Sequence, residues 1–330
     1  MSFILNGEDL DSLQSYLREK GWIAPAETLN SARKPGEGNM NYTLRVRTNF
    51  RSFIIKQSRD YVEKYPQIPA PAHRAVIEGQ FYELIQLDPV LRDYTPEISY
   101  IDYDNNIILL EDLGESSDMG LLYQKDKFFK ENEIEDLTRF LSILHQKFSP
   151  LPTPDLSNRD MRALNAEHIF HFPFMEENGF DLDTVTPGLQ EVAMKYKTDE
   201  ALKERVKSLS DYYLKDGPSL LHGDYYPGSW LRTVDAGIKI IDPEFCFYGR
   251  AEFDIGVMVA HMHLAQQPEI VVGKIAASYD EPEYFDPILT EKLTGVEVMR
   301  RLIGLAQLPL VLTLEEKEEL LERAYKWIMQ

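Results

Sequence analysis

Residues 220–230 read Leu-Leu-His-Gly-Asp-Tyr-Tyr-Pro-Gly-Ser-Trp, and residues 238–245 read Ile-Lys-Ile-Ile-Asp-Pro-Glu-Phe. Each segment begins with a short apolar run of the kind that predicts a buried strand. Asp224 follows the first run, and Asp242 and Glu244 follow the second. A turn rich in Pro and Gly separates them. The rest of the chain is interpreted from these two acidic sites and their order.

The two acidic sites match the needs of phosphoryl transfer. That reaction uses one carboxylate beside the attacking hydroxyl and separate carboxylates that hold Mg²⁺ on the nucleotide phosphates. Asp224 is predicted to orient or deprotonate the hydroxyl. Asp242 and Glu244, at a strand end, are expected to point to one face, because side chains alternate along an extended chain, and so to share one Mg²⁺. The alternative for either motif alone is an Asp that caps or begins a turn. The two motifs together, in this order, disfavour that alternative.

The sequence of this region resembles that of the aminoglycoside phosphotransferase and choline kinase superfamily and, within it, the methylthioribose kinase family. The matching positions are His222, Gly223, Asp224, Gly228, Ser229 and residues 242–245, 247–249 and 253–256. The resemblance implies ATP and Mg²⁺ as cofactors, a homodimer, and a bracing role for Asp254 under the catalytic loop. Ser229 stands where most relatives carry a metal-binding Asn, so it becomes the third predicted metal ligand beside Asp242 and Glu244.

The resemblance also implies the fold. We expect an α+β, bilobal, protein-kinase-like fold, with a β-rich nucleotide-binding lobe over residues 1–113. A mostly helical lobe over residues 114–330 is expected to carry the catalytic loop and the substrate site.

A glycine-rich turn between two predicted strands is the first candidate for phosphate binding. Residues 28–57 alternate in a way that predicts three strands, and Gly36 and Gly38 lie between the first two. Glycines in such a turn let backbone amides approach phosphate oxygens closely, although an ordinary hairpin is the alternative. The family's Gly-Asn-x-Asn wording matches residues 38–41, which adds Asn39 to the predicted nucleotide site.

Lys56 is the predicted phosphate-binding lysine. It comes late in an apolar strand, as the corresponding lysine does in kinase folds. A helix predicted over residues 73–87 carries Glu78, which in such folds pairs with the lysine. Glu83 is the second choice for this pair, and a solvated helix charge is the alternative for both.

Residues 97–103 and 107–110 are predicted as a strand pair, and Glu111, Asp112 and Leu113 follow it. This position suits a hinge between lobes. In the superfamily the adenine is held there by backbone groups, so the three residues are predicted to bind the nucleotide.

Residues 295–306 resemble the family segment in which two arginines precede an Ile-Gly-Leu-Ala run. The side chains of Arg300 and Arg301 are about 100° apart on a helix. At least one of them is expected to reach the substrate, because Arg donates well to sugar hydroxyls and phosphate. Surface charge is the alternative. The chain departs from the family at Tyr225 and Tyr226, which are expected to narrow the acceptor pocket with flat apolar faces.

Other patterns predict a loop over residues 65–72 and helices over 7–20, 128–148, 188–210, 255–264 and 314–328, with Asp254 as an N-cap. The single cysteine, Cys246, is predicted to be a buried packing residue. No apolar run reaches the ~18 residues that a membrane span needs, and no signal peptide is recognised, so a cytoplasmic location is expected. The net charge of −20 argues against nucleic-acid partners.

The predicted function is ATP-dependent phosphorylation of a hydroxyl on a small molecule, with a methylthioribose-like sugar as the first choice. Two alternatives stay open. One is a kinase for another small alcohol of the aminoglycoside, choline or homoserine type. The other is a catalytically weak, nucleotide-binding pseudokinase. A protein kinase is disfavoured because its His-Arg-Asp and Asp-Phe-Gly motifs do not occur.

Overall fold

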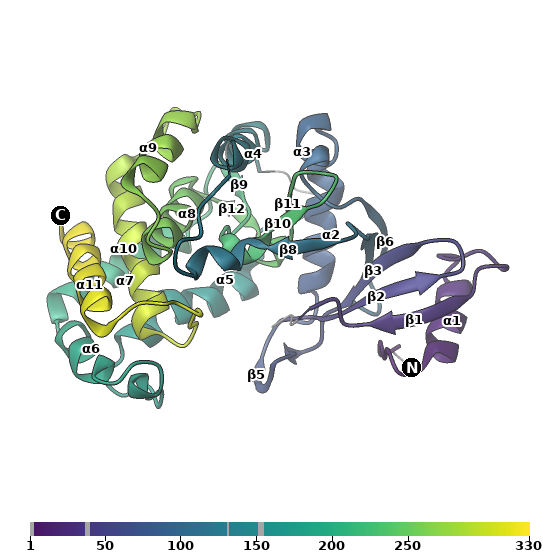
Figure 1. The fold of residues 1–330 in the computed structure, drawn as a ribbon, viewed down its shortest axis with the longest axis horizontal. Coiled ribbons are helices and arrows are strands. Elements are labelled where there is room, and N and C mark those ends of the chain that lie inside the picture. The colour runs from purple at the N-terminus through teal and green to yellow at the C-terminus, as the bar shows by residue number, and fades with distance from the viewer. Residues whose placement is uncertain (1–2, 37–39, 131, 151–154) are drawn as a thin grey trace. The chain divides into compact units, whose positions relative to one another are not determined.

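The computed structural model describes residues 3–36, 40–130, 132–150 and 155–330, and it is drawn in Figure 1. The chain divides into two compact units. Unit 1 consists of Met1–Ser116 and Thr233–Glu244, and unit 2 of Ser117–Arg232 and Phe245–Gln330. The short segment 233–244, which carries Asp242 and Glu244, therefore belongs with the N-terminal part of the chain.

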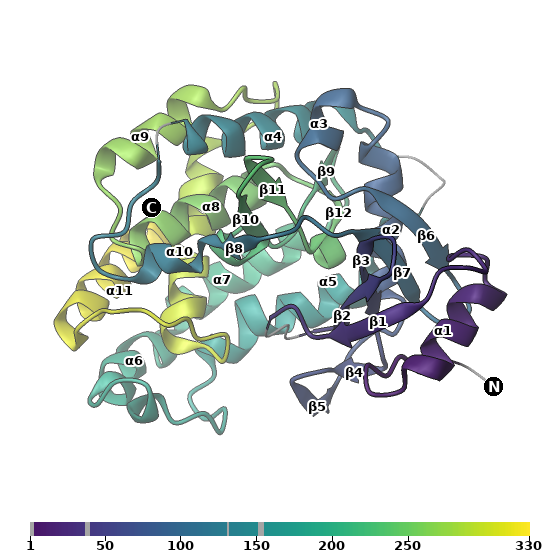
Figure 2. The same ribbon diagram turned by 45° about the vertical axis from the view of Figure 1, so that its right-hand side comes forward.

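Unit 1 is built on a five-stranded antiparallel sheet with the order β1-β2-β3-β7-β6 (Figure 2). The strands are β1 (Leu29–Arg33), β2 (Tyr42–Thr48), β3 (Ser52–Gln57), β6 (Ile98–Asp102) and β7 (Ile107–Glu111). Helices α1 (Leu10–Glu19), α2 (Arg74–Ile85) and α3 (Pro89–Asp93) and strand β11 (Ile238–Ile240) complete the main elements. The predicted strands of residues 28–57 and 97–110 are confirmed.

Alternation along β3 separates its two faces. Phe53 and Ile55 are buried in a core cluster that includes Leu13 and Leu17 of α1. Lys56 therefore points to the opposite face, toward α2. Helix α2 packs closely against this face, and Gly79 allows it: a Cβ at this position would lie only 2.8 Å from the side chain of Ile101 in β6.

The predicted loop over residues 65–72 is wrong in part. Strands β4 (Tyr61–Val62) and β5 (Tyr65–Pro69) form an antiparallel hairpin. The hairpin forms a two-stranded sheet of its own. Prolines are tolerated at such edges because an edge strand has backbone positions that need no ladder hydrogen bond.

Unit 2 is mainly helical. Its helices are α4 (Glu133–Lys147), α5 (Arg159–Ala166), α6 (Leu189–Lys197), α7 (Glu200–Tyr213), α8 (Glu252–Leu264), α9 (Glu269–Ser278), α10 (Pro287–Ile303) and α11 (Leu314–Met329). Strands β9 (Ser219–Leu221) and β12 (Phe247–Gly249) pair antiparallel, with Leu221 opposite Phe247. Short strands β8 (Ser116–Asp118) and β10 (Trp230–Thr233) and the 3-10 turns η1 (Met119–Tyr123), η5 (Pro227–Ser229) and η6 (Pro243–Phe245) lie in the connections.

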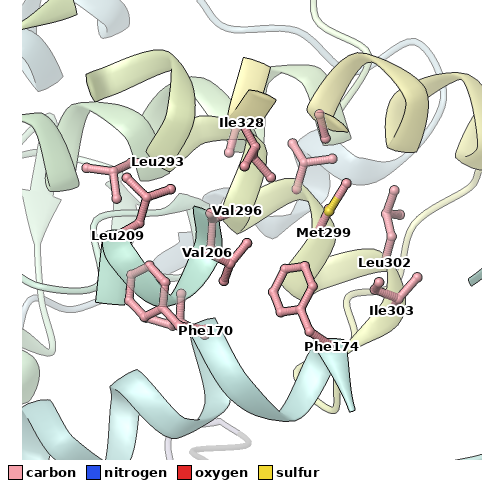
Figure 3. Packing of buried hydrophobic residues seen from close by; sticks show 14 of the residues in the cluster. Phe170, Phe174, Val206, Leu209, Leu293, Val296, Met299, Leu302, Ile303 and Ile328 are labelled. Atoms are coloured by element: carbon pink, nitrogen blue, oxygen red, sulfur yellow. The ribbon is translucent and has the colours of Figure 1, made fainter. Parts of the chain in front are cut away.

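Helix α10 contributes many of the side chains in the main core cluster of unit 2. Figure 3 shows Leu293, Val296, Met299, Leu302 and Ile303 of this helix packed among apolar side chains from other segments. The other labelled residues are Phe170, Phe174, Val206, Leu209 and Ile328. Because these contacts hold α10 firmly, its polar residues are held in fixed directions.

Two helix predictions for unit 2 are corrected. The helix predicted over residues 188–210 is two helices, α6 and α7, because Asp199 accepts a hydrogen bond from Leu202 N and caps a new start. Helix α8 begins at Glu252 after Ala251, so Asp254 lies in its first turn and is not the N-cap. Among the described residues, no helix has the length and apolar character needed to cross a membrane.

Candidate functional site

Lys56 lies in a buried ion-pair network within unit 1. Its Nζ donates to Glu78 Oε1 at 2.6 Å and also to Asp242 Oδ1. The predicted pairing of Lys56 with Glu78 is confirmed, whereas the second choice, Glu83, is exposed on α2. Burial by itself would lower the pKa of Lys56, but Asp242 and Glu78 raise it above its ordinary value. Burial raises the pKa of Glu78 to about 7, against the opposing effect of Lys56.

Asp242 and Glu244 are oriented by a turn and not by strand alternation. Strand β11 ends at Ile240, Asp242 has a φ of 61°, and residues 243–245 form η6. The expectation that an extended chain aligns the two carboxylates is therefore wrong. Asp242 is bound by Lys56 and its side chain is 44% exposed.

Glu244 is buried and has different partners. Arg74 Nε lies 3.3 Å from Glu244 Oε2, and Asn41 Nδ2 donates to the same oxygen at 3.1 Å. Burial raises the pKa of Glu244 to about 8, against the opposing charge of Arg74.

The donor set of unit 1 fits a divalent cation with bound phosphates. Three carboxyl groups (Glu78, Asp242 and Glu244) contact two cations (Lys56 and Arg74), and Asp242 is the most exposed of the three. Among the described residues, no three His, Cys, Asp or Glu side chains converge as a closed metal site. Mg²⁺ in kinases takes one or two carboxylates and completes its shell with phosphate and water, so an open pair of carboxylates fits it.

The other nucleotide-site predictions map to unit 1 as follows. Gly36 lies in a bend after β1, while Gly38 and Asn39 fall outside the described residues. Asp112 accepts from Arg45 Nε at 3.0 Å, which ties the predicted hinge to β2. The Glu111 carboxylate accepts a hydrogen bond from the backbone N–H of Glu97, and Leu113 is half-buried.

The loop that carries Asp224 is fixed from beneath in unit 2. The carboxylate of Asp254 accepts from His222 N at 2.7 Å and from Gly223 N at 3.0 Å. His145 Nε2 lies 3.2 Å from the same carboxylate. Gly223 has a φ of 83°, and a Cβ there would overlap the carbonyl oxygen of Phe245, so only glycine fits. The bracing contact predicted for Asp254 is confirmed.

Asp224 itself is half-buried beside a cation. Its side chain is 21% exposed, and Arg301 Nη2 lies 3.5 Å from Oδ1. Burial raises the pKa of Asp224, whereas the guanidinium groups of Arg301 and Arg300 oppose that rise. The Ser229 hydroxyl donates to the backbone carbonyl of Asp224 at 2.9 Å and is buried. Its predicted role as a metal ligand stays a prediction.

Glu297 holds both arginines and was not singled out in the sequence. Arg301 Nε donates to Glu297 Oε1 at 2.6 Å, and Arg300 Nη1 donates to Oε2 at 3.0 Å. His261 Nε2 lies 3.2 Å from Oε1, and the Tyr123 hydroxyl lies 2.5 Å from His261 Nδ1. Burial lowers the pKa of His261 to about 4, so a neutral ring with its hydrogen on Nε2 satisfies both contacts.

The spacing of Glu297 from Arg300 and Arg301, three and four residues along one helix, is a sequence signal that could have identified this acid. His261 and Tyr123 offer no such signal because they come from distant segments.

The two tyrosines at which the chain departs from the family sequence, Tyr225 and Tyr226, lie in different environments. Tyr225 is fully buried, donates to the carbonyl of Leu137 at 2.9 Å and stacks on Phe140. The prediction that it narrows the acceptor pocket is wrong, because it is a core residue. Tyr226 is half-buried, and the Arg301 guanidinium lies 4.9 Å from the centre of its ring. Cys246 is buried, as predicted.

Comparisons with known proteins show which proteins this chain is similar to. Residues 130–288 match the model of the phosphotransferase enzyme family. The chain is similar to methylthioribose kinase of Geobacillus sp. (strain WCH70), with 27% identity over 345 residues, 91% of this chain and 84% of that protein. It is also 27% identical to methylthioribose kinase of Exiguobacterium sibiricum over 248 residues, which are 72% of this chain and 62% of that protein.

Solved structures of phosphotransferases share the fold. Choline kinase LicA from Streptococcus pneumoniae aligns with a TM-score of 0.53 and 11% identity, over 96% of this chain and 98% of that one. An aminopropanol kinase associated with a microcompartment aligns with a TM-score of 0.53 and 15% identity, over 96% and 95%. The predicted α+β, kinase-like fold and the phosphotransferase class are thus confirmed.

A glycine substitution tests the packing beneath the loop that carries Asp224. Gly223→Ala is expected to destabilise unit 2 more than Gly179→Ala, because both positions have positive φ but only Gly223 lacks room for a Cβ. A left-handed alanine costs ~1–2 kcal/mol at either position, and overlap with Phe245 should at least double that loss at Gly223. Urea unfolding of both variants measures the difference. Equal losses would contradict the close contact.

Proposed function

We propose that this chain transfers the γ-phosphoryl group of ATP to a hydroxyl of a small sugar of the methylthioribose kind. The observation that carries the proposal is Asp224, a half-buried carboxylate on a loop fixed by Gly223 and Asp254, with Arg301 beside it. Such a carboxylate is placed to accept the hydrogen of an attacking alcohol. Methylthioribose kinases among its relatives support the choice of a sugar.

The residues of unit 1 are assigned to the nucleotide. Lys56, oriented by Glu78, donates to phosphate oxygens, and Asp242 and Glu244 hold Mg²⁺. When bound, the ion neutralises charge on the phosphates. The proposal keeps Gly36, Gly38 and Asn39 at the phosphates and residues 111–113 at the adenine. Spectinomycin phosphotransferase, which has the same fold with 12% identity and a TM-score of 0.51 over 96% of this chain and 97% of that one, was solved with ADP.

The residues of unit 2 are assigned to the acceptor. Asp224 orients the hydroxyl and takes its proton as the new phosphorus–oxygen bond forms, and ADP leaves. Arg300 and Arg301, held by Glu297, supply donors to the acceptor's oxygens or to the transferred phosphoryl group.

The charges around Asp224 favour a neutral acceptor. The carboxylates of Asp224 and Glu297 are matched by the guanidinium groups of Arg300 and Arg301, so this part of the site carries no excess negative charge. A cationic acceptor such as choline would need uncompensated carboxylates or a cage of aromatic faces. A sugar needs hydrogen-bond donors, which two arginines supply. The homodimer, the cytoplasmic location and the role of Ser229 stay predictions.

Removing the carboxylate at position 224 should abolish turnover. Asp224→Asn keeps the size of the side chain but cannot accept the proton, so kcat should fall about 10²–10⁴-fold. Binding of ATP, measured by calorimetry, should persist because the nucleotide residues lie in unit 1. Asp211→Asn, an exposed site on α7, is the matched control and should behave as wild type. A kcat for Asp224→Asn within a few-fold of wild type would remove Asp224 from the mechanism.

Acceptor charge is the second test. ATP consumption with methylthioribose and ribose is compared with consumption with choline and an aminoglycoside. Uncompensated like charge costs several kcal/mol in an interface, so kcat/KM for the neutral sugars should be about 10²-fold or more above that for the cations. Preferential phosphorylation of an amino alcohol would refute the sugar assignment and leave the kinase chemistry standing. Consumption with none of them would favour the pseudokinase.

A further inference from the structure

Arg74, the first residue of α2, is a fully buried arginine at the centre of unit 1. Its Nη1 donates to the carbonyls of Arg59 and Pro71, the latter at 2.9 Å. Its Nη2 donates to the carbonyls of Met40 and Tyr61, the latter at 3.0 Å. One guanidinium therefore fixes four separate points of the backbone, and one of them is Met40, which follows the glycine-rich turn.

The same guanidinium also contacts the acidic turn after β11. Arg74 Nε lies 3.3 Å from Glu244 Oε2. Asn41, the next residue after Met40, donates its side-chain amide to that same oxygen at 3.1 Å. Asn41 is thus bound to Glu244 directly, and Met40 is linked to Glu244 through Arg74.

Helix α2 is also linked to Asp242, the other acid of the Asp-Pro-Glu motif. Glu78 lies four residues after Arg74, on the same face of the helix, and binds Lys56, which binds Asp242. One helix face therefore holds Glu244 through Arg74 and Asp242 through Glu78 and Lys56. Gly79 lets this face approach the sheet closely, which fixes both contacts.

We propose that Arg74 is a positioning residue that couples Met40 and Asn41, the residues just before β2, to Glu244, so that phosphates and metal are bound as one unit. The inference rests on the proposed function, which assigns the glycine-rich turn to the phosphates and Glu244 to Mg²⁺. Arg74 acts here through Met40 and Glu244 and touches neither substrate. Its planar fork is needed, because a lysine has a single donor group and cannot bind several carbonyls and a carboxylate in fixed directions.

A purely structural arginine would give a different result. Its loss would lower stability and weaken all nucleotide binding equally. Loss of a residue that positions Glu244 should instead reduce the part of the ATP affinity that depends on Mg²⁺. The informative quantity is therefore a ratio. That ratio is the Kd for ATP in excess EDTA divided by the Kd for ATP in excess Mg²⁺, both from calorimetry on the full chain.

The test compares wild type with Arg74→Lys. The ratio should fall about tenfold or more, because loss of a group that orients a metal ligand typically weakens metal binding about 10–100-fold. Arg51→Lys is the matched control, because Arg51 also binds a carboxylate, Glu27, and a backbone carbonyl, that of Trp22. Its ratio should equal that of wild type. An unchanged ratio in Arg74→Lys, even with weaker binding overall, would overturn the inference.

A second variant covers the case in which Arg74→Lys does not fold. Asn41→Ala removes the other donor to Glu244 Oε2 and leaves the four backbone contacts of Arg74 in place. Its ratio should also fall, and a ratio equal to that of wild type would overturn the inference. Failure of the proposed function is recognised separately, because wild type itself would then bind ATP without any dependence on Mg²⁺.

Discussion

Lys56 is a charged side chain buried in the middle of a β-sheet, and the ion pairs that it makes with Glu78 and Asp242 determine how unit 1 is arranged. A buried charge without a partner costs several kcal/mol, so the carboxylates must be brought to the lysine. Glu78 comes from α2, and Asp242 comes from a segment almost two hundred residues further along the chain. The need to pair one lysine therefore explains why residues 233–244 belong with the N-terminal sheet.

In unit 2 the buried charge that needs partners is negative. Glu297 is a buried carboxylate, and Arg300, Arg301 and His261 surround it. The pKa of Glu297 lies well below its ordinary value because, despite its burial, Arg300 and Arg301 hold it ionised. Arg301 in turn lies beside Asp224, so the charge of this carboxylate, which we propose to be catalytic, is balanced by a side chain whose direction is already fixed. In both units, the ion pairs that neutralise buried charges also fix the direction of the side chains next to Asp242 and Asp224.

The sequence predicted the elements whose patterns are local. Strand alternation around Lys56 and the helical repeat of α4, predicted over residues 128–148, are visible in the local sequence, and the Lys56–Glu78 pair followed from the family resemblance. Three features were beyond such reasoning. Asp242 has a left-handed backbone where strand alternation predicted an extended one. The burial of Tyr225 depends on Phe140 and Leu137, some eighty-five residues away, and Glu297 gains His261 as a partner only when α8 and α10 meet.

Because Tyr225 packs in the core, Tyr226 is the one of these two tyrosines that lies beside Arg301, where we propose that the acceptor binds. The central claim is transfer of phosphate from ATP to a sugar hydroxyl, and phosphorus NMR tests it most directly. The full chain is incubated with ATP, Mg²⁺ and methylthioribose, with ribose in a parallel sample. We predict a new phosphomonoester resonance in at least one sample, which appears only with the sugar and grows in step with ADP. Inorganic phosphate as the only new phosphorus product besides ADP, or ATP left intact with both sugars, would contradict the account.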